Sequence, residues 1–377
     1  MSASPHRVQG LANDEVAADW PPIDAEALVG LARHVPALAG GRLCWRSPRP
    51  FSAAALVETA AGTLFVKRHA PSVRRAATLA EEHRFIRHLG ARGVPVVALL
   101  ADAAGHTAIE TDGWTWEVHA AGAGQDLYRQ TPSWTPLDTP QRALHAGRML
   151  AQLHRAAAGF HAPQRSTHLL VARDDLIRAE DPVALLHAQL RERPALAAYL
   201  AQRPWQRDLQ QHLLPLQAPV VAPLRGQPRL WTHNDWHASN LLWSDPGEQA
   251  HVTTVLDFGL AAPTSALFDL ATAIERNAIA WLALDTGVDP AHPQIALALL
   301  RGYRQVLPLD PAQVHLLADL LPVVHLDFAL SEVEYFAGPC GSPQSADVAY
   351  DTFLLGHAHW FGTPHGQALL TALRDAA

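Results

Sequence analysis

Short runs of apolar and β-branched residues, separated by turn residues, fill the chain between residues 42 and 119. Within this region, residues 73–89 instead repeat apolar positions at helical spacing, and the pattern ends at Gly90. We expect a small lobe with a five-stranded antiparallel sheet and one helix. Six runs are candidates for strands, one more than this sheet needs: residues 43–45, 54–59, 63–67, 96–100, 107–110 and 114–119.

From Pro140 onward, apolar positions recur mostly at helical spacing, which predicts a second, helical lobe. Prolines divide residues 163–228 into short amphipathic helices, and we expect this insert to contribute to substrate specificity. Longer helices are predicted at residues 143–158, 267–283, 294–306, 311–336 and 346–355.

The two patterns together predict an α+β protein of two lobes. The first lobe covers residues 1–119, and its first 40 residues form an extension with one short helix at residues 24–34. The second lobe covers residues 120–377. The small residues at 120–124 are typical of a hinge between such lobes.

Composition narrows the class of partner. The chain has 377 residues, enough for more than one core, and its net charge of −7 disfavours nonspecific nucleic-acid binding. Two distant cysteines, Cys44 and Cys340, indicate neither a disulfide framework nor a zinc site. No uncharged apolar stretch is long enough to span a bilayer, and residues 1–20 lack the apolar core of a secretory leader. We therefore expect a cytoplasmic protein without a membrane or nucleic-acid partner. The sequence does not indicate its oligomeric state.

The stretch from His233 to Asn240 carries the strongest chemical signal. It contains His-x-Asp, with Asp235 as the carboxylate, and the asparagine follows five positions later. An apolar run at residues 251–256 predicts a buried strand that ends at Asp257 of an Asp-Phe-Gly sequence. Two short strands joined by a tight turn would bring the two aspartates and the asparagine together. Phosphoryl transfer needs this set: a carboxylate for the acceptor hydroxyl, and oxygen ligands for Mg²⁺ on the phosphates of ATP.

These residues resemble the aminoglycoside phosphotransferase group and its choline-kinase-like and homoserine-kinase-like relatives, which share the protein-kinase fold. Family members carry His-Gly-Asp, an asparagine five positions after the aspartate, and then Asp-Phe-Gly or a close variant. Here Asn234 replaces the glycine, and asparagine is one of the few residues that tolerate positive φ. The resemblance implies ATP and Mg²⁺ as cofactors. It also implies Asp235 as the catalytic base, Asn240 and Asp257 as Mg²⁺ ligands, and His233 as a residue that fixes the loop.

Lys67, at the end of the third predicted strand, extends the resemblance. In kinases this lysine holds the α- and β-phosphates. Glu82, Ile86 and Leu89 match the family spacing E-x-x-x-L-x-x-L, so we expect Glu82 to pair with Lys67, with Glu81 as the second candidate. Taken alone, Lys67 would be interpreted as a strand-end lysine that reaches into water.

The loop between the first two predicted strands lacks the glycines of a protein kinase. Residues 46–54 contain none. Contacts to phosphate would then come from Ser52 and the amides that follow it, or the loop is an ordinary connection stiffened by proline.

Two further expectations follow from the resemblance. Glu117 and His119 precede the predicted hinge, and we expect their backbone to face adenine. Asp269, in an Asp-Leu-Ala sequence after Asp-Phe-Gly, is expected to brace the catalytic loop without touching substrate.

Three other interpretations stay open. Residues 81–83 and the strands that follow resemble the small lobe of the bacterial stress-response kinase, a protein Ser/Thr kinase. A pseudokinase would bind nucleotide without turnover. Finally, His233, Asp235 and His237 alternate along the chain, so an extended backbone would let them bind Zn²⁺ with Asp257 in a hydrolase.

A small-molecule acceptor is favoured over a protein. Few residues separate Gly259 from the helix expected near Leu267, and no Ala-Pro-Glu follows, which leaves no long activation loop for a peptide. A buried carboxylate would favour an amine-bearing acceptor, because such a group needs a cationic partner. An aminoglycoside, choline, homoserine or another hydroxylated metabolite would all fit. The candidate recognition residues are Glu275 with Arg276 beside it, Asp327, Glu332 and Glu334.

Overall fold

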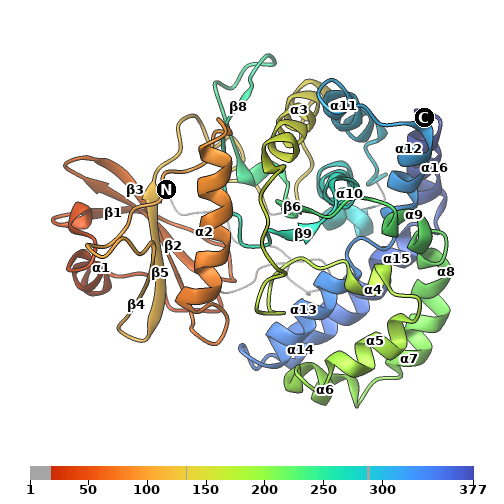
Figure 1. Ribbon diagram of the computed structural model, residues 1–377, viewed down its shortest axis with the longest axis horizontal. Coiled ribbons are helices and arrows are strands. Elements are labelled where there is room, and N and C mark those ends of the chain that lie inside the picture. The colour runs from red at the N-terminus through yellow and green to blue at the C-terminus, as the bar shows by residue number, and fades with distance from the viewer. Residues whose placement is uncertain (1–17, 133, 287–288) are drawn as a thin grey trace.

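An antiparallel sheet forms the small lobe of the computed structural model, which describes residues 18–132, 134–286 and 289–377 (Figure 1). The five strands lie in the order β1-β2-β3-β5-β4, and every neighbouring pair is antiparallel. The predicted sheet is therefore confirmed. The strands are β1 (Arg42–Arg46), β2 (Ala53–Thr59), β3 (Gly62–His69), β4 (Ala108–Thr111) and β5 (Trp114–Ala120).

One face of this sheet packs against the segment that precedes it, because side chains alternate between the two faces along a strand. Val57, Val66 and Val118 share a buried core with the segment that precedes the sheet. That segment includes α1 (Ala25–Ala32) and the 3₁₀ helix η1 (Pro36–Leu38), so the predicted N-terminal helix packs into the small-lobe core. The first 17 residues of the expected extension lie outside the described residues.

Helix α2 (Ala76–Gly90) lies between the sheet and the helical lobe (Figure 1). Its buried positions Leu79, Phe85, Ile86 and Leu89 fall on one side, as the helical spacing predicts. Phe85 and Leu89 join the core of the large lobe, so α2 ties the two lobes together.

The segment at residues 96–100 is not a strand of the sheet, contrary to the prediction. Val96 makes an isolated bridge to Val255 and Leu99 another to His119. Pro95 precedes this segment and has no N–H to donate to a ladder; its carbonyl accepts from the amide of Val255 at 2.7 Å. The segment thus connects the small lobe to the catalytic region.

Helices dominate the large lobe, and two of them pack at unusually short distance. A Cβ atom built on Gly147 would lie 2.1 Å from the carbonyl oxygen of Leu299, and one on Gly302 would lie 1.9 Å from that of Leu144. These helices, α3 (Pro140–Ala157) and α11 (Pro293–Arg304), can therefore pack this closely only with glycine at both positions.

The helix predicted at residues 311–336 is interrupted around Pro322, which cannot donate a helical hydrogen bond. The final helix, α16, was not predicted. The helices of this lobe are α3 (Pro140–Ala157), α4 (Asp175–Arg178), α5 (Pro182–Gln189), α6 (Pro194–Leu200), α7 (Trp205–Asp208), the π helix η2 (Leu209–Leu213), α8 (Leu214–Gln217), α9 (Val221–Arg225), the 3₁₀ helix η3 (Ala238–Asn240), α10 (Ala266–Ala278), the 3₁₀ helix η4 (Trp281–Thr286), α11 (Pro293–Arg304), α12 (Pro311–Leu320), α13 (Leu326–Ala337), α14 (Pro343–Asp347), the π helix η5 (Val348–Gly356), α15 (His357–Trp360) and α16 (Pro364–Arg374).

Two small two-stranded sheets lie where the lobes meet. One pairs β6 (Leu230–Thr232) with β9 (Ala262–Thr264), and the other pairs β7 (Leu241–Trp243) with β8 (Val252–Val255). The chain passes from the first sheet to the second at residues 233–240 and returns at residues 256–261. These two connections therefore lie side by side.

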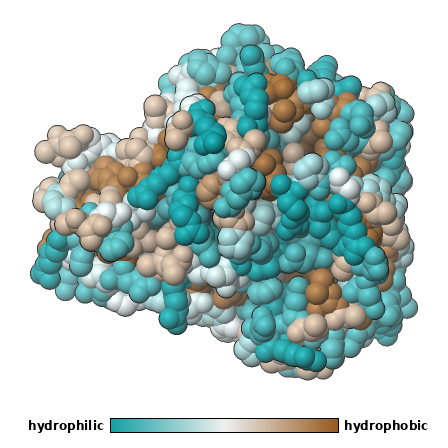
Figure 2. Space-filling view, in the orientation of Figure 1, coloured by the Kyte–Doolittle hydropathy of each residue, from teal (hydrophilic) through white to brown (hydrophobic). Residues whose placement is uncertain are grey.

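On the face in Figure 2, hydrophilic residues predominate and the hydrophobic patches are scattered, so this face has no broad apolar band. Among the described residues, no helix has the length and apolar character needed to cross a bilayer.

Candidate active site

The connections at residues 233–240 and 256–261 bring the predicted catalytic residues to one cavity. The amide of Leu256 donates to the carbonyl of Asn240 at 2.9 Å. The Asn240 side-chain nitrogen donates to the backbone oxygen and to Oδ2 of Asp235, at 2.9 and 3.0 Å. Asp235, Asn240 and Asp257 all line this cavity, as the hairpin prediction required.

Asn234 occupies the left-handed region with φ of 61°, which explains why the family glycine can be asparagine here. The side chain also stabilises the turn. Its Oδ1 accepts from the hydroxyls of Thr232 and Thr264, at 2.9 and 3.0 Å. The substitution therefore keeps the loop geometry.

Asp269 braces the catalytic loop, as predicted. Its carboxylate accepts from the amides of His233 and Asn234, at 2.9 and 2.8 Å, and contacts the ring of His154 at 2.9 Å. Both ring nitrogens of His233 are also engaged: Nδ1 accepts from the amide of Asp235 at 3.1 Å, and Nε2 donates to the carbonyl of Leu256 at 2.8 Å. His233 therefore fixes the loop.

Replacing Asp269 with alanine is expected to lower the free energy of unfolding by about 3 kcal/mol. Two buried amides lose their acceptor, and each unsatisfied donor costs about 1–3 kcal/mol. The expected readout is a lower urea midpoint. Activity should fall in the fraction that stays folded, because the loop that carries Asp235 loses its support. An unchanged midpoint would contradict this role.

Lys67 lies at the cavity and pairs with Asp257. Its Nζ is 3.1 and 3.2 Å from the two carboxylate oxygens. Burial alone would lower the pKa of Lys67, but attraction to Asp257, Glu117 and Glu82 outweighs burial and raises it. Burial alone would raise the pKa of Asp257, yet Lys67 lowers it to about 2. Both groups are therefore charged at neutral pH.

Glu82 does not pair with Lys67 directly, contrary to the prediction. Its Oε2 accepts from Nη2 of Arg165 at 2.8 Å, and Nε of the same arginine donates to Glu81 at 2.9 Å. Arg165 also donates to the carbonyl of Ala261, just after the Asp-Phe-Gly sequence. Sequence reasoning missed Arg165 because it lies in a segment without periodicity, and only the fold brings it to α2.

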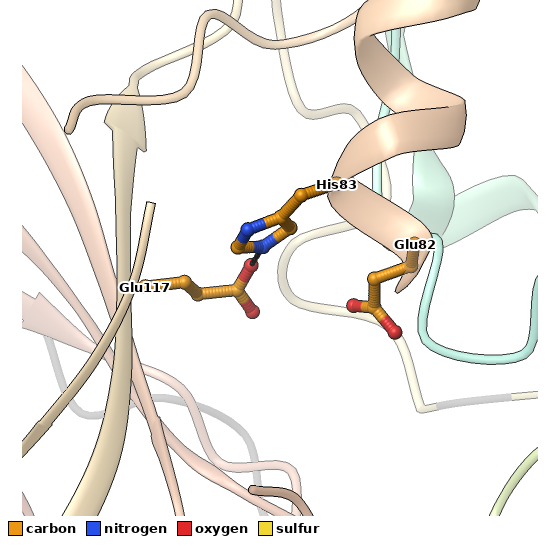
Figure 3. Close-up of side chains that lie close together, drawn as sticks. All are labelled: Glu82, His83 and Glu117. Carbon is orange, nitrogen blue, oxygen red and sulfur yellow. Dashed lines mark hydrogen bonds and ion pairs between the residues drawn. The ribbon is translucent and has the colours of Figure 1, made fainter. Parts of the chain in front are cut away.

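Glu117 belongs to a buried network in which its carboxylate faces the ring of His83 (Figure 3). Its carboxylate lies 3.0 Å from His83 and 3.3 Å from His69. Burial alone would raise the pKa of Glu117, but these hydrogen bonds and the charge of Lys67 hold it well below its ordinary value. The second ring nitrogen of His83 lies 2.9 Å from the Thr107 hydroxyl. The side chain of Glu117 therefore has a defined structural position.

Ligand atoms of Glu82, His83 and Glu117 lie within 4.8 Å of one another, a spacing that could hold a metal ion. The surroundings argue against one. Each of the three side chains already has a protein partner, and Lys67 and Arg165 supply positive charge nearby. Hydrogen bonds and these two cations therefore satisfy the cluster without a metal.

The prediction that the backbone of Glu117 and His119 faces adenine does not fit the sheet. Glu117 is paired with Lys67, and His119 with Phe65, inside the β3–β5 ladder. Their side chains, however, both line the cavity. The predicted strand ends one residue too early, and the amide of Ala121 still donates to the carbonyl of Thr63 in β3 at 3.0 Å, so the connection beyond the sheet begins at Gly122.

The expected hinge is anchored to the large lobe. The carbonyl of Ala123 accepts from the hydroxyls of Thr253 and Thr254, at 2.7 and 2.8 Å. Gly124 has φ of 109°, and a Cβ there would lie 2.1 Å from Thr253 Oγ1. Glycine is therefore required at this position for close approach to β8.

The residues expected to bind Mg²⁺ have suitable donors. The amide nitrogen of Asn240 is committed to Asp235, which turns its oxygen the other way. Asp257 supplies a carboxylate that is charged at neutral pH. Carboxylate and amide oxygens suit Mg²⁺. The Zn²⁺ set expected for a hydrolase fits poorly, since both nitrogens of His233 are hydrogen-bonded inside the protein.

One cavity of about 660 Å³ connects these groups to a second, aromatic end. Lys67, Ser52 and the start of the hinge line the first end, so the predicted phosphate-loop residue Ser52 does reach the cavity. The second end, which we call the acceptor end, lies beyond Asp235. It is lined by the ring cluster of Trp134, Trp281, Phe328, Phe353 and His357, and by Glu332.

Of the four predicted recognition carboxylates, Glu332 lines the acceptor end. Burial raises its pKa to about 8, partly offset by Arg276. Two of the others contact the surrounding fold: Glu334 pairs with Arg193 at 2.6 Å, and Asp327 accepts from the amide of Leu176. The fourth, Glu275, lies 3.3 Å from a ring nitrogen of His357, and these two atoms form no hydrogen bond.

Arg276 lies between the catalytic loop and the acceptor end. It donates to Oδ1 of Asp235, and its guanidinium lies 5.0 Å from the ring centroid of Trp134 and 5.4 Å from that of Phe328. Asn240 and Arg276 thus fix both oxygens of Asp235. The sequence indicated Arg276 only through its neighbour Glu275, and gave no sign of its contact with Asp235.

Comparison with known families agrees with this geometry. A family model described as the phosphotransferase enzyme family matches residues 50–317. A search of curated proteins finds no match.

Solved structures with the same fold cover nearly the whole chain. An aminoglycoside phosphotransferase from Alicyclobacillus acidocaldarius is 16% identical, with a TM-score of 0.51 over 94% of this chain and 97% of that one. A microcompartment-associated aminopropanol kinase is 16% identical, with a TM-score of 0.58 over 94% and 100%. An amicoumacin kinase, solved in complex with AMP-PNP, Ca²⁺ and Ami, is 13% identical, with a TM-score of 0.53 over 89% and 88%. At these identities the likeness supports the two-lobed kinase-like fold alone.

Proposed function

The chain belongs to the phosphotransferase enzyme family, and from this premise we propose that it transfers the γ-phosphate of ATP, with Mg²⁺, to a hydroxyl of a small-molecule acceptor. The observation that carries the proposal is the common cavity of Lys67, Asp235, Asn240 and Asp257, with an aromatic acceptor end beyond Asp235. A volume of about 660 Å³ suits two small ligands side by side.

In the proposed reaction Asp235 orients the acceptor hydroxyl and takes its proton. The hydroxyl oxygen forms a bond to the γ-phosphorus. The bond from that phosphorus to the β–γ bridging oxygen breaks, and its electron pair leaves with ADP. Asn240 and Arg276 keep the carboxylate of Asp235 in one orientation throughout.

Lys67 would hold the α- and β-phosphates, and Asn240 and Asp257 would hold Mg²⁺, which would neutralise phosphate charge. With Asp257 as a ligand of the ion, Lys67 would be available to the phosphates, while the nearby charges of Glu117 and Glu82 would still attract it. The AMP-PNP complex of the amicoumacin kinase supports nucleotide use by this fold.

Adenine would lie against the hinge. We propose the backbone of Gly122 and Gly124 for this contact, because both line the cavity just beyond the sheet, whereas the amide of Ala121 and the carbonyl of Ala123 already have protein partners. Ser52 would contact the phosphates from the opposite side. The lobes would then divide after β5, with this segment as the connection.

A small acceptor is favoured over a peptide. After Gly259 the chain enters β9 (Ala262–Thr264) directly and then α10, which leaves no extended platform for a peptide. The acceptor end instead has walls of aromatic residues around Glu332. A carboxylate among aromatic rings suits an ammonium group, which both attract. The aminopropanol kinase of the same fold is consistent with an amino alcohol.

Glu332→Gln is expected to lower kcat/KM for an amine-bearing acceptor by roughly 30-fold or more. The reason is that the ammonium group would lose its buried ionic partner, a loss of about 2 kcal/mol or more. In the wild type, the acceptor KM should fall as pH rises through about 8, because Glu332 then ionises. The variant should lack this pH dependence. Glu248→Gln, an exposed change, serves as the control and should behave as wild type.

The same substitution predicts a change in stability of known sign. The pKa of Glu332 is raised to about 8 in the folded state. The free energy of unfolding therefore falls as the pH rises from the ordinary pKa of a glutamate toward about 8. Glu332→Gln should therefore raise the melting temperature relative to wild type at pH 8.5. An equal or lower value there would contradict burial of an unpartnered carboxylate.

The proposed function is tested by ADP release with a panel of hydroxyl compounds, each paired with its analogue lacking the amine. We expect turnover with at least one amino alcohol or amino sugar, and a weaker rate with its paired analogue. ADP release that no compound stimulates would contradict transfer to a small acceptor.

A further inference from the structure

The loop between β1 and β2 has a rigid form despite its lack of glycine. The amide of Ser47 donates to the carbonyl of Ala54 at 2.8 Å, and the amide of Arg49 donates to the Ser47 hydroxyl at 3.2 Å. Pro48 and Pro50 flank Arg49. Proline fixes its own φ and restricts the residue before it, so the backbone on both sides of Arg49 has little freedom.

This loop is docked onto the large lobe. The ring of Phe51 lies 5.3 Å from that of Tyr335 and 5.9 Å from that of Phe336, both on α13. The carbonyl of Pro50 accepts from the amide of Asp19 at 3.2 Å, and the Tyr335 hydroxyl donates to the carboxylate of Asp19 at 2.8 Å. The loop is therefore held in place over the cavity.

Arg49 lines the cavity beside Lys67, Asp235 and Asp257. Burial lowers the pKa of Arg49, and attraction to Asp235, Asp257 and Asp126 opposes that effect. An arginine stays charged under any such shift near neutral pH. The loop thus brings a positive charge to the cavity, within electrostatic reach of the proposed base and the proposed metal ligand.

We propose that Arg49 is a further catalytic residue, whose guanidinium binds the γ-phosphoryl group during transfer in place of the missing glycine-loop amides. This inference rests on the proposed phosphotransferase function. A glycine-rich loop brings backbone N–H groups to phosphate, and this loop, flanked by prolines, brings a side-chain fork that can donate two hydrogen bonds at once.

The chemistry explains why such a cation is useful. As the acceptor oxygen bonds to phosphorus and the bond to the bridging oxygen breaks, negative charge spreads over the three oxygens of the moving group. The proton goes to Asp235 and the leaving electron pair to ADP. Arg49 would donate to those oxygens from the side of the small lobe, while Lys67 holds the phosphates that remain on ADP.

The test compares Arg49→Ala and Arg49→Lys with Arg46→Ala, an exposed arginine three residues earlier that donates to the carbonyl of Ile23. Two quantities are measured: ATP turnover, and affinity for ADP with and without aluminium fluoride, which mimics the phosphoryl group in transfer. We expect Arg49→Ala to lower turnover by about 10³-fold, the usual worth of such an arginine. ADP affinity should stay unchanged, and the tighter binding with aluminium fluoride should be lost.

Arg49→Lys should recover part of the turnover, because lysine keeps the charge but loses the fork. Normal turnover in Arg49→Ala would overturn the proposal. An equal loss of ADP affinity with and without aluminium fluoride would also overturn it, and so would a rise in acceptor KM with no change in kcat. If the wild type itself fails to bind ADP with aluminium fluoride or to turn over ATP, the proposed function fails, and the role of Arg49 fails with it. If the wild type binds ADP more tightly with aluminium fluoride and Arg49→Ala does so equally, only the role of Arg49 is overturned.

Discussion

Asp235→Asn is expected to lower kcat by at least about 10²-fold while ATP affinity stays within about twofold, because general-base catalysis contributes about 10²–10⁴-fold. The amide has the shape of the carboxylate but cannot accept the acceptor proton. Its oxygen can keep the hydrogen bond from Asn240, whereas its NH2 group would face the Arg276 donor and lose that contact. The loop should keep its form because Asp269 still holds the amides of His233 and Asn234. Steady-state turnover and equilibrium titration with ATP measure the two effects separately.

Asp375→Asn is the matched control, since that aspartate is exposed near the C-terminus. It should have normal turnover. A kcat for Asp235→Asn close to that of the control would remove Asp235 from the mechanism and reopen the hydrolase interpretation.

Asp257→Ala is expected to lower turnover by about 10³-fold and to remove the Mg²⁺-dependent part of nucleotide binding, since a bound metal ion supplies several kcal/mol of charge stabilisation. In the wild type, ATP with Mg²⁺ at about 100 times Kd should stabilise the fold by about 2.7 kcal/mol, which is about 3 °C in Tm for this length. ATP with EDTA should give a smaller shift. In the variant the two shifts should be equal.

The exposed Asp289→Ala serves as the control and should keep the difference between Mg²⁺ and EDTA. If Asp257→Ala also keeps that difference, Asp257 does not bind the metal. One equivalent of copurifying Zn²⁺, together with no shift from ATP, would contradict the kinase account as a whole.

The catalytic loop could be predicted because its geometry is local. Asp235 and Asn240 are five positions apart in one turn, and the run of β-branched residues that ends at Asp257 pairs with the strand that follows Asn240. Lys67 could be predicted for a similar reason: alternation along β3 puts it on the face opposite to Val66. In each case a short stretch of sequence contains the whole constraint.

The errors arise where distant segments meet. Glu82 has the expected position on α2, but Arg165, 83 residues further along, takes its carboxylate. The same limit hid Arg276, whose contact with Asp235 spans 41 positions, and Arg49, whose loop is positioned by α13. Nothing in local periodicity specifies which of the many arginines will reach a given carboxylate.

Phosphoryl transfer to a small molecule can be measured by following labelled γ-phosphate from ATP in a mixture of small hydroxyl compounds and casein-like or histone-like proteins, with Asp235→Asn as the blank. We expect label in a small-molecule phosphate ester, strongest for an amine-bearing acceptor, and little label on protein. Label on Ser or Thr of the enzyme and of added protein, with none on any small molecule, would contradict the account and favour a protein kinase.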